Sequence, residues 1–156
     1  MKKLIHHKDM LTIRELRESD RALMETFWTG LSENTFKMWD HYNTVPDIFS
    51  EKSHKLIGLK GGKIVVYGFL LPNYDFQDTP SLGITTLDSE QRKGFGTAMM
   101  KRLEEVAKSK GYKNIFLTTF TDNTPAYSLY KEMGYAVQGI VKRSGKDSYA
   151  MKKRLR

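Results

Sequence analysis

The sequence predicts an α+β fold: a mixed central β-sheet of about six to seven strands, flanked by about four helices. Strand-like and helix-like runs alternate irregularly, with Gly or Pro at most boundaries. One pair of strand-like runs flanks a tight glycine turn, which predicts antiparallel pairing. A later strand, helix, strand unit requires parallel pairing. The chain has 156 residues, of which 39% are hydrophobic, so we expect a single domain over residues 1–156.

The N-terminal elements follow from alternation and capping. Apolar residues at 11 and 13 alternate with polar ones, which predicts a short first strand. Ser19 or Asp20 can cap a helix, and Ser32 can cap a second, shorter one. The inward apolar residues are Leu23, Met24, Phe27 and Leu31 in the first helix, and Phe36 and Trp39 in the second.

Strands are predicted at Lys55–Leu59 and Ile64–Leu71, where Gly61-Gly62 permits a tight hairpin turn, and at Leu82–Leu87. A helix from about Gly96 to Lys110 and a strand over Lys113–Phe120 complete the parallel unit. The last elements are a helix with Pro125 in its first turn and Gly134 after its end, and then two closing strands, Tyr135–Val141 and Ser148–Lys152.

Composition and charge restrict the class of ligand and the cellular compartment that we expect. Lys and Arg number 26 against 18 Asp and Glu, and the net charge of +8 favours an anionic ligand. The absence of cysteine excludes disulfides and thiolate chemistry. Met1–Leu11 holds no signal-peptide core, and no stretch approaches the roughly 20 apolar residues of a membrane span, so we expect a cytoplasmic protein. The four histidines lack metal-ligand spacing, and no metal is expected.

The segment Gln91-Arg92-Lys93-Gly94-Phe95-Gly96-Thr97 lies between a predicted strand and the long helix. Its glycines allow successive N–H groups to converge ahead of a helix N-terminus, which is a phosphate-binding arrangement. The spacing excludes a P-loop, and Met99 occupies the third small position of a dinucleotide fingerprint. The alternative is that the two glycines only shape the turn.

Gln91-x-x-Gly94-x-Gly96 resembles the acyl-CoA-binding turn of the GNAT superfamily of N-acetyltransferases. Residues 123–135 resemble the second signature of that superfamily, N-x-x-A-x-x-L-Y-x-x-x-G-[FY], at the expected distance and in the expected order. The predicted order of elements agrees over roughly the whole chain. The sequence is therefore identified as a member of this superfamily, with a single GNAT-like domain.

The resemblance implies that acetyl-CoA lies where the strand ending at Leu87 splays from the strand around Ile115. It implies that the Leu87 N–H donates to the thioester oxygen, and that main-chain N–H groups of residues 91–97 hold the diphosphate. Asn123 would bond the cofactor arm or cap its helix, and Ala126 would leave room for the arm. The expected cofactor-binding residues are Leu87, Asp88, Gln91, Arg92, Lys93, Gly94, Phe95, Gly96, Thr97, Asn123, Ala126 and Tyr130.

Tyr130 occupies the position of the superfamily's general acid, which assists departure of the CoA thiolate; the alternative is a buried aromatic of the helix. The acceptor amine must lose a proton before it attacks. Asp78 is the base candidate, with Asp75 and His54 as alternatives. The predicted activity is transfer of an acetyl group from acetyl-CoA to a primary amine of a small molecule, an aminosugar or a protein.

Aromatic and acidic residues around the first helices and the 72–80 loop suggest a pocket for a cationic amine. They are Trp28, Phe36, Trp39, Tyr42, Phe49, Tyr74 and Phe76, with Glu33, Asp40, Asp47, Asp75 and Asp78. Two other functions stay open: an acyl-CoA-binding domain without turnover, and a nucleic-acid or ribosome-binding module based on the basic stretch 142–156. Nucleic acid is the disfavoured partner, and we expect a monomer or homodimer.

Overall fold

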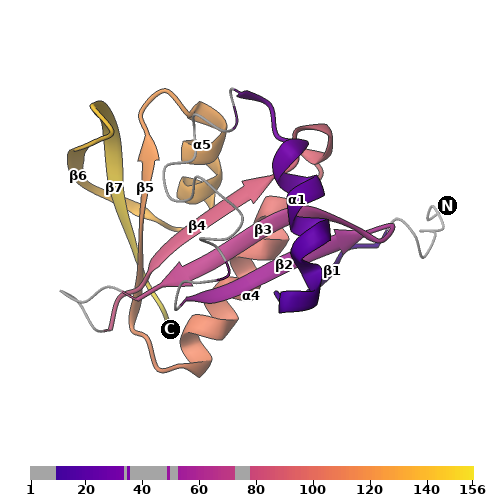
Figure 1. Ribbon diagram of the computed structural model, residues 1–156. Helices are drawn as coiled ribbons and strands as arrows, with labels where there is room; N and C mark the ends of the chain where they lie inside the picture. Colours follow the sequence, from indigo (N-terminus) through magenta and orange to yellow (C-terminus); the bar gives the residue numbers. More distant parts are fainter. Residues whose placement is uncertain (1–9, 34, 36–48, 50–52, 73–77) are drawn as a thin grey trace, which may run out of the picture.

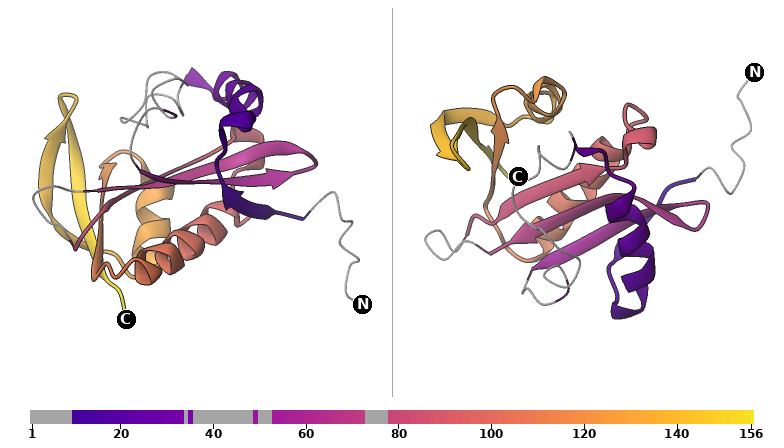
Figure 2. Two further views of the ribbon diagram at one scale, coloured as in Figure 1. Left: turned by 60° about the horizontal axis from the view of Figure 1, so that its bottom comes forward. Right: turned by 45° about the horizontal axis from the view of Figure 1, so that its top comes forward.

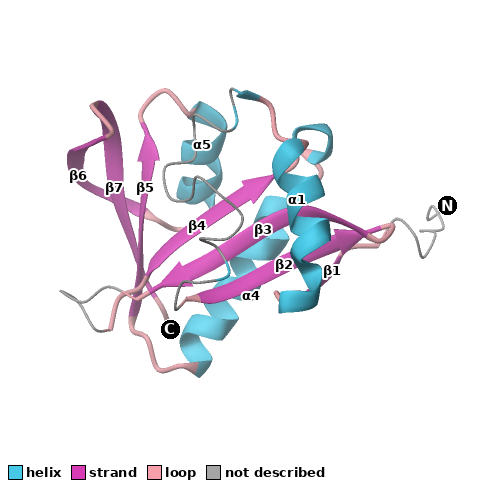
Figure 3. Cartoon of the chain, in the orientation of Figure 1, coloured by secondary structure: helices cyan, strands magenta, loops and turns pink. Residues whose placement is uncertain are grey.

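The computed structural model describes residues 10–33, 35, 49, 53–72 and 78–156. Within them, seven strands form one sheet in the order β1-β2-β3-β4-β5-β7-β6, accompanied by three α-helices and two 3-10 turns (Figure 1 and Figure 3). The elements are β1 (Thr12–Glu15), η2 (Glu18–Asp20), α1 (Arg21–Thr29), β2 (His54–Lys60), β3 (Lys63–Leu71), β4 (Ser81–Thr86), η3 (Asp88–Glu90), α4 (Phe95–Ser109), β5 (Asn114–Phe120), α5 (Thr124–Glu132), β6 (Ala136–Arg143) and β7 (Lys146–Arg154).

The predicted fold class is confirmed. The hairpin β2–β3 is antiparallel, and β4 and β5, joined through α4, are parallel. Fewer helices are described than the four expected, because the predicted second helix, with Phe36 and Trp39, falls on residues outside the described ranges.

Helices cover both faces of the sheet. Figure 2, left, shows α1 on one side and α4 and α5 on the other. Met24 and Phe27 of α1 pack on Tyr67 and Phe69 of β3 in one core cluster. Side chains of α4 and α5 form the second cluster with the opposite face, which includes Val66 and Leu117. The two clusters define an α1 face and an α4/α5 face.

Gly68 of β3 allows α4 to lie directly on the sheet. A Cβ atom at this position would be 2.7 Å from Cγ of Met99 and 2.9 Å from Cδ1 of Leu103, closer than real carbon contacts. Any side chain at position 68 would push α4 outward. The start of α4 is therefore held at a fixed height above β3 and β4.

The sheet opens between β4 and β5. β4 pairs with β3 over six residue pairs, and β5 pairs with β7 over seven, but β4 and β5 share the single pair Ser81–Phe116. At that closed end, the N–H groups of Lys113 and Phe116 donate to the carbonyl oxygens of Asp78 and Pro80 at 2.9 and 3.0 Å. Beyond it the two strands diverge toward their C-terminal ends (Figure 1).

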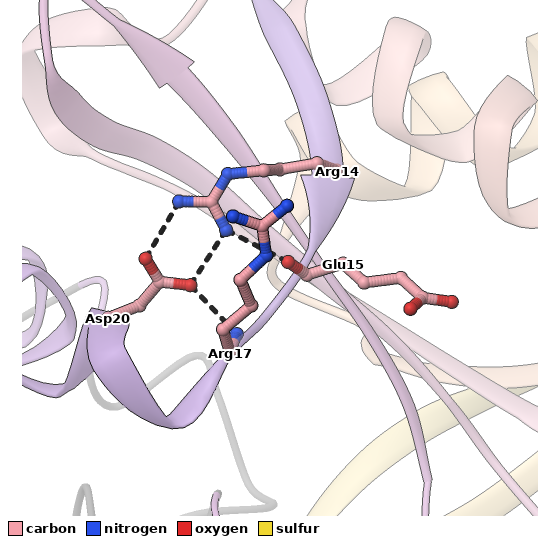
Figure 4. A network of polar contacts seen from close by, with 4 residues as sticks. All are labelled: Arg14, Glu15, Arg17 and Asp20. Carbon is pink, nitrogen blue, oxygen red and sulfur yellow. Dashed lines mark hydrogen bonds and ion pairs between the residues drawn. The ribbon is translucent and has the colours of Figure 1, made fainter.

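A buried ion pair joins β1 to the start of α1 (Figure 4). The two terminal guanidinium nitrogens of Arg14 donate to the Asp20 carboxylate, at 2.7 and 2.8 Å, and the Arg17 N–H donates to it at 2.8 Å. The side chain of Asp20 is 5% exposed. These hydrogen bonds, led by that from Arg14, hold the pKa of Asp20 below its ordinary value despite burial.

We predict that Asp20→Asn lowers the free energy of unfolding by about 2 kcal/mol at pH 7, because charge-assisted hydrogen bonds are lost. A carboxyl group with a depressed pKa stabilises the fold above its unfolded-state pKa, near 3.8, and that contribution disappears as the pH falls through its folded-state value. Urea titrations from pH 7 to pH 2 should therefore show the two proteins converging below about pH 4. A difference that stays constant down to pH 2 would contradict this role.

Candidate active site

A cavity of about 500 Å³ occupies the opening between β4 and β5. One wall is β4 with the turn that follows it and the start of α4, and the other is the end of β5 with α5. β6, β7 and the segment after α1 contribute one residue each. The lining residues are Thr35, Leu82, Gly83, Ile84, Thr85, Thr86, Glu90, Gln91, Arg92, Gly94, Phe95, Gly96, Thr97, Thr118, Thr119, Phe120, Asp122, Asn123, Pro125, Ala126, Leu129, Tyr130, Arg143 and Ser148.

The turn before α4 presents backbone N–H groups to this cavity. Arg92 and Gly94 have φ angles of 64° and 83°, so two left-handed residues bend the chain sharply. Gly94 is the N-cap of α4 and no side chain of the described residues caps it. The first intrahelical bond runs from the Ala98 N–H to the Gly94 carbonyl at 3.0 Å. The N–H groups of residues 95–97 thus lack intrahelical acceptors, where the helix dipole favours an anion.

Gln91 joins the turn to the end of β4, because its side-chain amide donates to the Thr86 carbonyl at 3.2 Å. Glu90 accepts hydrogen bonds from Lys60 at 2.8 Å and from Lys93 at 3.1 Å, and these contacts, chiefly that with Lys60, hold its pKa below the ordinary value. The ammonium group of Lys93 is therefore directed at Glu90, and Lys93 does not line the cavity.

The position of Leu87 corrects one expectation. Its N–H donates to the Val65 carbonyl at 2.8 Å, so this amide is part of the β3 ladder and is not available to a ligand. Amides in antiparallel strands face alternate sides, so the N–H groups of Ile84 and Thr86 point away from β3, toward the opening. The hydrogen bond from the Gln91 side chain to the Thr86 carbonyl agrees with this direction, because the N–H and C=O groups of one strand residue point to the same side.

Asp88 serves a structural contact instead of lining the cavity. Its carboxylate accepts hydrogen bonds from the Ser32 N–H at 2.9 Å and from the hydroxyls of Ser32 and Thr35 at 2.8 and 2.9 Å. Burial opposes its ionisation, but these hydrogen bonds outweigh burial and keep its pKa below the ordinary value. The side chain ties the segment after α1 to the turn after β4 and does not line the cavity, so cofactor contact at Asp88 stays a prediction that this arrangement does not support.

Asp78 lies at the closed end of the opening. Its side chain accepts from the Thr79 hydroxyl at 2.9 Å, and its carbonyl accepts from the N–H groups that begin β5. At about 3.3 Å per residue, the length of β4 separates it from the turn before α4. His54 pairs with Leu70 at the same end of the sheet, and Asp75 lies outside the described residues. The structure therefore brings neither Asp78 nor His54 to the cavity.

Tyr130 projects from α5 into the cavity lining and is 7% exposed. Burial raises the pKa of its phenol to about 12, so the hydroxyl stays protonated at neutral pH. The Tyr130 and Tyr135 rings pack in an edge-type arrangement, with ring centroids 6.2 Å apart. Asn123 is the N-cap of α5, but its side chain makes no capping bond to the described residues. Asn123 and Tyr130 therefore present polar atoms near the same opening.

The cavity brings together most residues that the two sequence signatures singled out. They are Gln91, Arg92, Gly94, Phe95, Gly96, Thr97, Asn123, Ala126 and Tyr130. Leu87, Asp88, Lys93 and Asp78 are not among its lining. The sequence did not indicate Thr86, because the direction of its amide depends on which residues of β4 hydrogen-bond to β3. It did not indicate Ser148 either, because this residue belongs to no recognised motif.

Within the described ranges, no cluster of three or more His, Cys, Asp or Glu side chains is arranged to hold a metal ion. No described helix is long and apolar enough to cross a membrane.

The family model for the acetyltransferase (GNAT) family matches residues 13–135. The chain belongs to the GNAT acetyltransferase family. The uncharacterized protein YxbD of Bacillus subtilis (strain 168) is 36% identical to this member over 58 residues, which is 36% of this chain and also 36% of that relative. The match thus spans about a third of the curated relative's length.

Solved structures agree with this GNAT fold. An acetyltransferase of the GNAT family from Streptococcus pneumoniae superposes with a TM-score of 0.77 at 22% identity, covering 94% of this chain and 100% of that one. The structure of yncA from Salmonella typhimurium, solved with its cofactor acetyl-CoA, gives 0.77 at 17% identity, with 94% of each chain covered. At these identities the likeness shows the fold alone.

Proposed function

We propose that this protein transfers an acetyl group directly from acetyl-CoA to a primary amine. One observation carries the proposal: the uncapped N–H groups at the start of α4 open onto the same cavity that receives the outward amides of β4. Anionic phosphates suit the first group of donors, and amide and thioester carbonyls suit the second. The acetyl-CoA present in the yncA structure supports the choice of ligand.

The residues of the cavity fit acetyl-CoA. The N–H groups of residues 95–97 would hold the diphosphate, and Arg92 adds positive charge at the same turn. Asn123 offers an amide side chain beside the path of the pantetheine arm, and Ala126 keeps the start of α5 small. The net charge of +8 acts in the same direction.

Bound acetyl-CoA supplies an acetyl thioester, whose carbonyl carbon is the electrophile and whose thiolate is the leaving group. We assign the oxyanion donor to the Thr86 N–H in place of Leu87, because Thr86 faces the opening. A preorganised donor of this kind stabilises developing negative charge by about 3 kcal/mol. The backbone of β4, held by β3, keeps that donor fixed.

Tyr130 holds a proton near the proposed leaving group. With a pKa of about 12 its phenol is neutral in the resting protein and can donate a hydrogen bond. A CoA-type thiol has a pKa of about 8.5, so complete transfer of the phenolic proton to its thiolate would be uphill by about 5 kcal/mol. Tyr130 therefore shares its proton with the departing sulfur, and the proton that finally resides on sulfur originates from the amine.

We assign the acceptor amine to the α1 face of the opening, because the uncapped start of α4 and Tyr130 belong to the α4/α5 face. Most of the aromatic and acidic residues expected to form its pocket lie outside the described ranges. Of those described, Trp28 is 8% exposed within the α1 core, and Phe49 lies beneath the Arg21 guanidinium at 4.3 Å. These two aromatics are occupied in packing, so an aromatic cage for a cation gains no support from them.

Ion pairs within the basic stretch 142–156 favour the enzyme over a nucleic-acid-binding module. Lys142 contacts Asp147 at 2.9 Å, Lys146 contacts Asp122 at 3.1 Å, and Lys153 contacts Glu104 at 2.9 Å. These acidic partners neutralise part of the positive charge that a phosphate-binding strip needs. Amine-dependent release of free CoA thiol distinguishes the enzyme from an acyl-CoA-binding domain without turnover. The panel of amines for this assay is spermidine, Nα-acetyl-lysine, glucosamine and an alanine-terminated peptide.

We predict that Gly94→Val weakens acetyl-CoA binding at least tenfold, because a branched side chain resists the left-handed φ of 83° that aligns the turn. Gly111→Val is the matched control: φ is 84°, a Cβ also meets nothing within 4 Å, and the site is the opposite end of α4. Calorimetry should show loss of affinity for the first variant alone, although both lose stability. Equal affinities for both would contradict the proposed cradle.

For Tyr130→Phe we predict a fall in kcat of about a hundredfold with the acetyl-CoA Kd unchanged within twofold, because only the proton-sharing hydroxyl is removed. Tyr127→Phe provides the comparison, since Tyr127 lies on the same helix and its ring packs against Tyr149 at 4.6 Å, outside the cavity lining. Thiol release with the fastest amine of the panel measures both. Undiminished turnover in Tyr130→Phe would remove this residue from the mechanism.

A further inference from the structure

Ser148 carries a buried hydroxyl that no described residue satisfies. The residue is 1% exposed, and its Oγ atom has no hydrogen-bond partner within the described ranges. It nevertheless lines the cavity between β4 and β5. A buried hydroxyl without a partner destabilises a protein, so the missing partner is to be sought in what enters the cavity.

The strand register places this hydroxyl on the α1 face. Ser148 of β7 is paired with Phe120 of β5, whereas the next residue, Tyr149, pairs with Thr119 and stacks on Tyr127 of α5. Successive side chains of a strand point to opposite faces, so Ser148 points away from α5. Thr118 and Thr85 share its face and also line the cavity.

This placement separates Ser148 from the elements that face acetyl-CoA. The uncapped start of α4 and the Tyr130 side chain belong to the α4/α5 face. Among the described lining residues the two carboxylates are Glu90 and Asp122, and both already accept hydrogen bonds from lysines. On its own face Ser148 is surrounded by hydroxyl groups, the Phe120 ring and Arg143 of β6, whose pairing with Lys146 puts it on the same face.

We propose that Ser148 is an acceptor-binding residue whose Oγ accepts a hydrogen bond from an N–H of the neutral primary amine as it attacks. This inference rests on the proposed acetyltransferase function and adds the chemistry of the acceptor side. A buried subsite lined by hydroxyl groups and by the cation of Arg143 favours the neutral amine over its ammonium form, because burial and a nearby like charge both disfavour the ammonium ion. The acceptor is therefore bound as a free amine that has lost its proton.

Ser148→Ala tests this assignment against Ser128→Ala, which removes an exposed hydroxyl from α5 outside the cavity. We expect the acceptor KM of Ser148→Ala to rise about tenfold for the fastest amine of the panel, with the calorimetric Kd for acetyl-CoA unchanged within twofold. Its Tm should rise by about 3 °C, since an unsatisfied buried hydroxyl is gone. Ser128→Ala should match the wild type in kinetics and in acetyl-CoA affinity.

An unchanged acceptor KM, with wild-type turnover intact, would overturn the role of Ser148 and leave the proposed function standing. A weakened acetyl-CoA Kd would reassign the hydroxyl to the cofactor, and a lowered Tm would show that it is satisfied within the fold. Both results contradict the inference. A wild-type protein that neither binds acetyl-CoA nor releases thiol would overturn the function and this inference together.

Discussion

The separation of β4 from β5 after a single residue pair is the constraint on which the site depends. A strand within a sheet normally has its N–H and C=O groups paired on both sides. Here β4 is held by β3 alone over most of its length, and its outward amides face a cavity. Those amides are polar, fixed in direction and available to a ligand.

The divergence is stable because each strand is secured elsewhere. β5 follows β7 over its whole length, and β4 follows β3, so the two halves of the sheet twist apart as separate units. Helix α4 connects them and presses on Gly68, which places its N-terminus beside the end of β4. The two sets of unpaired donors, from the strand and from the helix, therefore converge on one space.

Local signals in the sequence predicted much of this arrangement. Some signals determine the backbone conformation of only the few residues around them: a glycine at an N-cap, a proline in a first helical turn and a glycine pair in a hairpin. The sequence could therefore locate the elements and the turn at 91–97. Both signatures then lead to residues that line one cavity. The second helix and most of the expected acceptor pocket lie outside the described residues.

The errors at the site concern long-range partners and strand phase. The direction of the amide N–H alternates along β4, so an error of one residue in choosing the donor reverses its direction. From the sequence we chose Leu87, whereas Thr86 is the residue whose amide faces the opening. The carboxylate of Asp88 has partners 53 and 56 residues away, and no local pattern reveals them. Ser148 attracts attention because its buried hydroxyl has no partner among the described residues, and only the packed structure reveals this.

Amide hydrogen exchange at Thr86 and Leu87, measured by NMR with and without acetyl-CoA, tests the opened strand most directly. The Leu87 amide, bonded to Val65, should exchange slowly in both states. The Thr86 amide should exchange much faster in the free protein and slow at least tenfold on saturation with acetyl-CoA. A Thr86 amide that is already protected without ligand, or that stays fast with ligand bound, would contradict the role given to the separated strands.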